Sequence, residues 1–286
     1  MNKIFRDNEL NQEFIKYGYV ILNDKLSMDF KKVYDFFNSL ESKVDNKFYS
    51  SLWSSDNKYR TIVDSEIKRI LTPFCESYLD SYLPFFSDLL VKKPSLNHKL
   101  NWHQDWTFTD ERLFTQVFFW APLQDVTIRN GCIMILPKSH LFFNSLRGGN
   151  IPSGLDYNKL NELEKKYAQY IVLKKGDILV FNQSLLHASL PNRSLKNRLA
   201  LGLYCLPKDA PKYHYHYDQV AKRILRYHID LDFIIQFSAN QDFKNNILNQ
   251  SMSVPAGEFE EFSVDLIRPF FPEVYERYES ELTALN

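Results

Sequence analysis

Seven short segments between residues 84 and 206 constrain the fold of this chain more than any other feature. They are rich in leucine, β-branched and aromatic residues, and turn residues separate them. Short strands at such intervals are typical of a β-sandwich or a jelly roll, so we expect a mainly β core. The predicted strands are 88–92, 99–106, 114–120, 132–136, 171–173, 177–182 and 198–206.

The first eighty residues carry a helical pattern instead. An amphipathic run between Asp7 and Gly18 has a capping residue at each end. A short strand over 19–22 follows, and helical periodicity returns after Ser27 and over much of 64–82. The pattern beyond Leu206 is mixed, with a last helix predicted at about 271–285. We expect one domain over 1–286, with a helical layer over 1–83, the β core over 84–206 and a helical extension over 207–286.

Charge and cysteine content exclude few functions. Lys plus Arg and Asp plus Glu number 35 each, so no net field attracts nucleic acid or an anionic membrane. The sequence has no signal-peptide-like start and no segment near the roughly 18 apolar residues of a membrane span. Cys75, Cys132 and Cys205 lie far apart among apolar residues, which favours reduced packing residues. We expect a cytoplasmic protein without nucleic-acid or membrane partners.

His103 and Asp105 form a candidate metal-binding pair. On a strand, alternate residues point to one face, so these two side chains converge while Gln104 turns away. His187 can complete a triad of two imidazoles and one carboxylate. On a six-coordinate iron(II), this facial arrangement leaves three positions open, two for a chelating 2-oxo acid and one for dioxygen.

The pair alone is short enough to occur by chance. His228 and Asp230 have the same spacing, but no histidine follows them. Their surroundings, 222–232, resemble a charged helix, so we interpret this pair as a chance occurrence. His214 and His216 also mimic a metal pair, and we interpret them as part of a partly exposed strand or loop.

The segment that carries His187 makes the first pair more specific. A turn and buried strand over 176–181 run to His187, and Arg198 follows eleven residues later on a return strand. In a hairpin of this size, the arginine lies beside the histidine. Its planar guanidinium can bind the distal carboxylate of a dicarboxylate held at the iron. Ser189 can add a hydrogen bond, and Ala200 and Gly202 leave room for the ligand.

An ordered set of short motifs over about residues 10 to 206 resembles the phytanoyl-CoA dioxygenase family of non-haem iron oxygenases. The eleven-residue spacing between His187 and Arg198 belongs to this set. The matching pieces are Tyr17-Gly18-Tyr19-Val20, Lys93-Pro94, Trp102-His103-Gln104-Asp105, Trp120, Asn130-Gly131-Cys132, Pro137-Lys138-Ser139-His140, Gly176-Asp177, His187-Ala188-Ser189 and Arg198.

This resemblance implies a double-stranded β-helix that uses iron(II), 2-oxoglutarate and dioxygen, usually for hydroxylation. It implies that the three metal-site residues are iron ligands, that Arg198 and Ser189 bind the distal carboxylate, and that Trp120 lines the cofactor pocket. Related halogenases carry a small residue in place of the carboxylate, so Asp105 favours oxygenation. The chain departs from the family at Lys138, where the family often has glycine, and we assign His140 no ligand role.

Two other classes of function remain open. A zinc hydrolase can use the same His, Asp and His ligands with an activated water, and a non-catalytic protein can bind metal or 2-oxoglutarate as a sensor. Arg198 and Ser189 favour the oxygenase, because a hydrolase needs no site for a dicarboxylate cosubstrate.

The substrate is predicted only as a small molecule. Aromatic residues near the motif, together with Arg60, suggest a pocket for a molecule with an anionic or polar end. An amino-acid-like or other small biosynthetic intermediate is the first candidate substrate, and a carrier- or coenzyme-linked acyl chain is the second. The glycine-rich loop 147–154 is the predicted mobile segment over the site. The aromatic residues are Trp53, Tyr59, Trp102, Trp106, Phe108 and Phe118.

Overall fold

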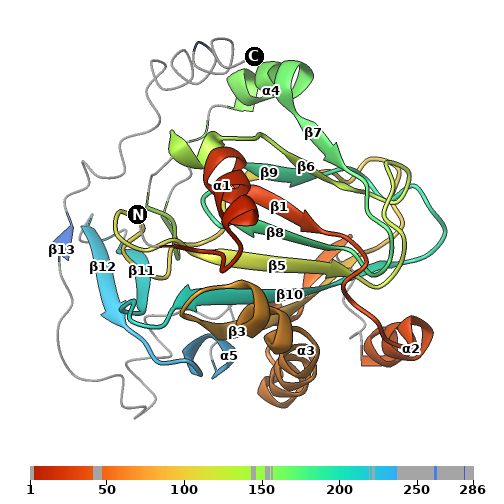
Figure 1. Cartoon of the computed structure of the whole chain (residues 1–286), viewed down its shortest axis with the longest axis horizontal. Coiled ribbons are helices and arrows are strands. Elements are labelled where there is room, and N and C mark those ends of the chain that lie inside the picture. The colour runs from red at the N-terminus through yellow and green to blue at the C-terminus, as the bar shows by residue number, and fades with distance from the viewer. Residues whose placement is uncertain are drawn as a thin grey trace.

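Two antiparallel sheets form the centre of the molecule (Figure 1). The computed structural model describes residues 3–40, 47–142, 146–151, 155, 157–218, 220, 223–236, 261–262 and 280. The larger sheet has the order β1 (Tyr19–Leu22), β8 (Ile178–Asn182), β5 (Val117–Pro122), β10 (Arg198–Pro207), β3 (Tyr82–Lys92), β2 (Phe48–Ser50). The smaller sheet has the order β4 (Leu100–His103), β9 (His187–Ser189), β6 (Ile133–Ile135), β7 (Gln169–Ile171). The predicted mainly β jelly roll with flanking helices is confirmed.

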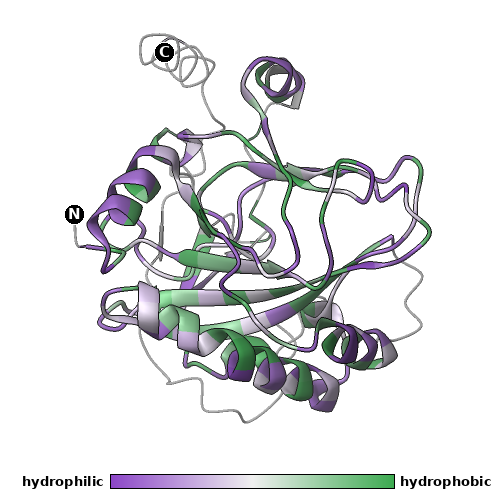
Figure 2. Ribbon diagram, turned by 45° about the vertical axis from the view of Figure 1, so that its right-hand side comes forward, coloured by the Kyte–Doolittle hydropathy of each residue, from purple (hydrophilic) through white to green (hydrophobic). Residues whose placement is uncertain are grey.

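Helices cover the outer face of the larger sheet, where their apolar sides form one core with it (Figure 2). Gly18 ends the first helix with φ 85°, and its N–H donates to the Phe14 carbonyl, as the sequence predicts. No helix among the described residues is long and apolar enough to cross a membrane. The covering helices are α1 (Asn8–Tyr17), α2 (Phe30–Leu40) and α3 (Asn57–Tyr78).

β10 shows how period-two alternation divides the core. Leu199, Leu201 and Leu203 pack toward the helices. Ala200 and Tyr204, on the opposite face, pack into the space between the two sheets. The face of β10 that begins with Arg198 therefore lines the interior of the jelly roll.

The motif around Lys138 keeps the backbone conformation that a glycine would favour. Lys138 has φ 69°, in the left-handed region that side chains rarely adopt. The next histidine, His140, bonds through Nε2 to the Ile15 carbonyl at 3.1 Å. A Cβ on Gly18 would lie 2.5 Å from its Nδ1. His140 therefore joins this loop to α1.

The C-terminal region differs from the prediction. β11 (Tyr213–Asp218) pairs with β12 (Arg223–His228), which also pairs with β13 (Glu261–Phe262). The predicted charged helix over 222–232 is wrong, because pairing with β11 outweighs the local pattern. Between residues 207 and 236, the described residues form one short helix, α5 (Phe233–Gln236). The helix predicted at 271–285 lies outside the described residues, apart from Ser280.

The other differences concern boundaries and short elements. β1 and β2 form the two edges of the larger sheet, so residues 1–83 contribute strands as well as helices. The predicted hairpin from His187 to Arg198 is wrong: β9 pairs with β4 and β6 in the smaller sheet, whereas β10 pairs with β3 and β5 in the larger sheet. The buried, free cysteines agree with their predicted packing role. Three further helical elements are η1 (Ser51–Trp53), η2 (Ser139–Leu141) and α4 (Tyr157–Tyr167).

Candidate functional site

His103, Asp105 and His187 come together at one end of the smaller sheet. β4 pairs with β9 so that His103 lies opposite His187. Asp105 lies two residues beyond the end of β4, where its N–H donates to the Gln183 carbonyl at 3.0 Å. One possible ligand atom from each of the three side chains lies within 4.8 Å of the others. His187 Nε2 is 3.9 Å from Asp105 Oδ1.

Both histidines are oriented by backbone carbonyls. Nδ1 of His103 lies 2.8 Å from the Asn101 carbonyl oxygen, and Nδ1 of His187 lies 3.0 Å from that of Leu185. A proton on Nδ1 satisfies each carbonyl and leaves the Nε2 lone pair available to a metal.

Burial shifts the pKa values of these three residues. It lowers the pKa of His103 and of His187 to about 4, with the neighbouring histidine adding to the effect at His103. Burial also raises the pKa of Asp105 to about 6, against the opposing influence of His103 and Arg147. At neutral pH the site therefore offers two neutral imidazoles and one carboxylate, which is the protonation state that metal ligands need.

One carboxylate atom supports the fit to a metal ion. Oδ2 of Asp105 is buried and has no hydrogen-bond partner. A buried acceptor without a partner is costly in a folded protein. A divalent cation held by Asp105 and the two Nε2 atoms would satisfy it, and two histidines with one carboxylate are a ligand set typical of iron(II).

A buried lysine and a buried arginine lie in the interior of the jelly roll, on the opposing sheet. Lys92 on β3 lies directly opposite Arg198 on β10, and both are buried. Lys92 Nζ donates to Ser189 Oγ at 2.6 Å. Burial and then the charge of Arg198 lower the pKa of Lys92 to about 6. Burial lowers the pKa of Arg198 to about 10.

Arg198 is held in place but keeps a free donor. Its Nη1 donates to the Gly131 carbonyl at 2.7 Å, and its guanidinium lies 5.1 Å from the centre of the Trp120 ring. Its Nε is buried without a partner. No carboxylate pairs with Lys92 or Arg198 in the described part of the chain. Arg198 and the Lys92 amine therefore form a candidate anion site, in which no described carboxylate neutralises the guanidinium.

Gly131 is a backbone position that this anion site requires. Its φ is 89°, and a Cβ there would lie 2.7 Å from the Leu190 carbonyl oxygen and 3.0 Å from Cδ of Lys92. Any side chain would therefore displace the carbonyl that holds Arg198.

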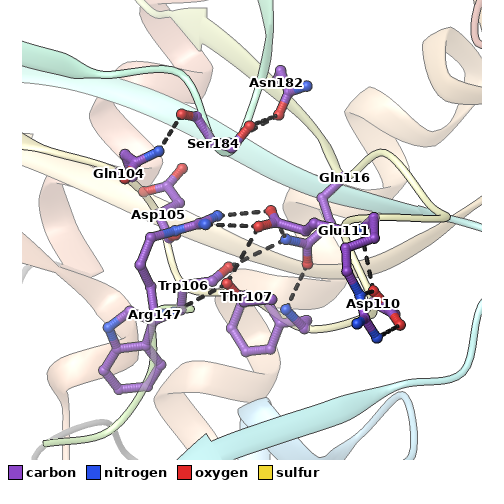
Figure 3. Close-up of polar contacts among 12 residues, drawn as sticks. Gln104, Asp105, Trp106, Thr107, Asp110, Glu111, Gln116, Arg147, Asn182 and Ser184 are labelled. Atoms are coloured by element: carbon purple, nitrogen blue, oxygen red, sulfur yellow. Dashed lines mark hydrogen bonds and ion pairs between the residues drawn. The ribbon is translucent and has the colours of Figure 1, made fainter. Parts of the chain in front are cut away.

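A polar network supports the segment that carries Asp105 (Figure 3). Arg147 Nε donates to the Asp105 carbonyl at 2.6 Å, and its two Nη atoms donate to the Glu111 carboxylate at 2.6 and 2.7 Å. Glu111 also accepts from Gln116 Nε2 at 2.6 Å. The beginning of the glycine-rich loop is thus tied to the segment beside the metal-site residues.

We expect Glu111→Gln to lower the free energy of unfolding by on the order of 2 kcal/mol, because it removes one charge from a largely buried, two-bond ion pair. Urea unfolding would measure this. Arg112→Gln is the matched control: it breaks the contact with Asp110, but its side chain is 79% exposed, so we expect less than about 1 kcal/mol. Equal effects of the two changes would contradict the supporting role of the network.

A cavity of about 850 Å³ joins the metal-site residues to Arg198 and Ser189. Of the aromatic residues predicted around the substrate, four line it: Trp53, Trp106, Phe108 and Phe118. Trp102 instead donates from Nε1 to Glu164, and Tyr59 packs in the outer core. The predicted substrate role of Arg60 is not supported, because its guanidinium donates to the carbonyls of Ser54, Ile235 and Gln236.

Sequence reasoning missed Tyr204 and the histidines of β11 as cavity-lining residues and Lys92 as the neighbour of Arg198. Tyr204 follows Arg198 at even spacing on β10 and lines the cavity. Burial, together with the charges of Asp105 and Asp88, raises its pKa, so the phenol stays protonated. Even spacing along a strand was a usable signal for Tyr204. Lys92 required knowledge of which strand lies beside β10.

The fold and the site together define a jelly-roll protein with a His, Asp and His group facing a buried cationic pocket. The model of the phytanoyl-CoA dioxygenase (PhyH) family matches residues 16–200. The chain therefore belongs to this family, as the ordered motifs predicted.

Curated relatives share part of this region. A phytanoyl-CoA dioxygenase domain-containing protein 1 homolog of Dictyostelium discoideum is 33% identical over 127 residues, covering 42% of this chain and 45% of the relative. The phytanoyl-CoA dioxygenase of Arabidopsis thaliana is 30% identical over 130 residues, covering 43% and 44%. The matched region thus spans less than half the length of these relatives.

Solved structures share the fold at low identity. The 2-oxoglutarate-dependent carbocyclase SnoK of nogalamycin biosynthesis has a TM-score of 0.52 at 18% identity, over 72% of this chain and 86% of SnoK. HygX of Streptomyces hygroscopicus, solved with nickel, 2-oxoglutarate and hygromycin B, has a TM-score of 0.51 at 13% identity, over 71% and 88%. Both likenesses support the jelly-roll architecture.

Proposed function

We propose that this protein is an iron(II)- and 2-oxoglutarate-dependent dioxygenase that hydroxylates an unactivated C–H bond of a small molecule, with release of succinate and CO2. One observation carries the proposal: three candidate metal-ligand side chains share one cavity with Arg198, a buried cation that pairs with no described carboxylate. A dicarboxylate that bridges a metal and a cation fits this arrangement. Membership in the phytanoyl-CoA dioxygenase family supports the same chemistry.

The residues divide the work between two ends of the cavity. His103, Asp105 and His187 would hold iron(II), with the Nδ1 atoms of both histidines fixed by carbonyls. Arg198 and Lys92 would bind the distal carboxylate of 2-oxoglutarate, with Ser189 between the metal and Lys92. Trp120 would form one wall under the guanidinium. Iron(II), when bound with 2-oxoglutarate, supplies the activation of dioxygen.

The anion site separates this proposal from the zinc hydrolase. A hydrolase with the same ligands activates one water and has no use for a buried, unpaired arginine with a lysine beside it, away from the metal. A non-catalytic binder of metal and 2-oxoglutarate would use the same residues, so turnover must be tested as well as binding.

Anaerobic addition of iron(II) and 2-oxoglutarate should produce the weak visible charge-transfer band of the chelate. Admission of oxygen should then release succinate, faster with substrate than without. Folded protein that gives no band would overturn the proposal, and a band without succinate would favour the non-catalytic binder. A screen of amino acids, natural-product intermediates and acyl thioesters would extend the test to the first- and second-choice substrate classes.

We expect binding of 2-oxoglutarate near pH 7 to take up a proton at Lys92. In the ligand-free protein its pKa is lowered to about 6, so above that pH the amine is mostly neutral. A carboxylate beside it favours the charged form and raises the pKa again. Calorimetry in buffers of different ionisation enthalpy would measure the uptake. Lys92→Gln should abolish the buffer dependence, and a dependence that persists in this variant would exclude Lys92 as the acceptor.

A further inference from the structure

The end of the cavity away from Arg198 is built from segments that the metal site and the anion site do not use. One wall is aromatic, and β11 contributes polar side chains beside it. Gly149 and Asn150, from the loop before α4, line the cavity next to the aromatic wall and β11. The lining residues at this end are Trp106, Phe108, Gly149, Asn150, His214, His216, Phe233 and Ile234.

His214 and His216 occupy alternate positions of β11 and therefore lie on the same face of the strand. Both are buried, and their ring centres are 6.4 Å apart. The His214 ring lies 5.8 Å from that of Trp106 and 5.6 Å from that of Phe233. Two imidazoles and two aromatic rings thus surround one volume.

Gly149 allows the loop to lie directly against these histidines. Its N–H donates to the Tyr215 carbonyl, and its carbonyl accepts from the Tyr217 N–H, both at 2.8 Å. A Cβ at this position would lie 2.9 Å from His216 Nδ1 and 3.4 Å from His214 Nε2. Although the sequence suggests a mobile loop, this part of it is bonded to β11 and forms a wall of the cavity.

The charges near this end argue against an ionic substrate. Burial, and then His216, lowers the pKa of His214 to about 3, so this imidazole is neutral at physiological pH. Arg147 is paired with Glu111, and Arg60 donates to three carbonyls. Among the described residues that line the cavity, Arg198 is the one Arg or Lys, and the proposed cosubstrate would occupy it.

The cavity also contains a carboxylate that is already bonded. Asp88 accepts hydrogen bonds from Ser50 Oγ at 2.8 Å, Ser51 N at 3.0 Å and Ser51 Oγ at 2.9 Å. Burial raises its pKa to about 7, so it offers only a weak counter-charge to a cation. An anion or a cation at this end would remain largely unpaired, and burying an unpaired charge is costly.

We propose that the end of the cavity away from Arg198 is a substrate site for an uncharged, ring-containing molecule. This molecule packs against Trp106 and Phe233 and hydrogen-bonds through hydroxyl or carbonyl groups to His214 and His216. Neutral imidazoles can donate and accept hydrogen bonds, and aromatic walls favour flat or cyclic ligands. This inference rests on the proposed function and selects uncharged biosynthetic intermediates over free amino acids and acyl thioesters.

A pair of probes with one skeleton tests the charge preference: 1-naphthylacetamide, which is neutral, and 1-naphthylacetate, which is an anion. Binding would be measured by equilibrium dialysis against the anaerobic protein loaded with iron(II) and 2-oxoglutarate. We expect the amide to bind at least about tenfold more tightly. Equal binding, tighter binding of the acid, or binding of neither probe would overturn the inference. Loss of the charge-transfer band in the wild type would instead overturn the proposed function.

Substitution of the histidines tests the hydrogen bonds. We expect His214→Phe and His216→Phe each to weaken binding of the amide roughly fivefold or more while the charge-transfer band persists. His98→Phe, outside the cavity lining, is the matched control and should leave binding unchanged. Unchanged amide binding in both cavity variants, with the band intact, would exclude these histidines. If a variant loses the band, the probe pair on the wild type still decides the substrate class.

Discussion

Asp105→Ala should reduce succinate release and substrate oxidation by at least about 100-fold, with little loss of stability. The carboxylate supplies one of three proposed metal ligands, and its Oδ2 is buried without a partner in the protein. Removing it leaves no hydrogen-bond donor unsatisfied at that atom. The measurements are succinate yield, the anaerobic charge-transfer band and the urea unfolding curve.

Asp230→Ala is the control for Asp105, because it removes the carboxylate of the second His-x-Asp pair. Asp230 is exposed, and its Oδ1 accepts the N–H of Asp232. We expect this variant to retain turnover and the band. Full turnover by Asp105→Ala would show that the aspartate is not a required metal ligand. The preference for oxygenation over halogenation, which depends on this carboxylate, would then lose its support.

Arg198→Gln should raise the KM for 2-oxoglutarate roughly 10- to 100-fold, because a buried carboxylate would lose a charge-assisted hydrogen-bond partner. The variant also loses the donor to the Gly131 carbonyl and the contact with Trp120. Arg198→Lys should recover part of the affinity, since it keeps the charge but not the planar guanidinium. Titration of the charge-transfer band with 2-oxoglutarate would give the affinities.

Arg193→Gln is the matched control for Arg198, because Arg193 is an exposed arginine in the connection between β9 and β10. The affinity of the Arg193→Gln variant for 2-oxoglutarate should match that of the wild type. A normal affinity in Arg198→Gln would place the distal carboxylate elsewhere, with Lys92 as the next candidate. A variant that binds 2-oxoglutarate weakly but unfolds at the wild-type urea concentration would attribute the effect to the missing cation.

The candidate metal site was predictable because the information that points to it is local. The His-x-Asp spacing predicted that the side chains of His103 and Asp105 converge, and the eleven-residue spacing between His187 and Arg198 identified the remaining residues. The structure brings the same three metal-site residues together. Short, separated β segments likewise predicted a jelly roll, since pattern and turn residues are properties of neighbouring positions.

Strand pairing determined the parts of the cavity that the sequence did not predict. Lys92 becomes part of the anion site because β3 lies beside β10 in the register that sets it opposite Arg198. β11 and β12 form a hairpin despite a charged pattern in 222–232, and this hairpin turns two inconspicuous histidines into cavity walls. Local sequence specifies which side chains share a face of a strand. Which faces meet depends on contacts between residues far apart in the chain, so only the tertiary structure placed Lys92 beside Arg198 and brought β11 to the cavity.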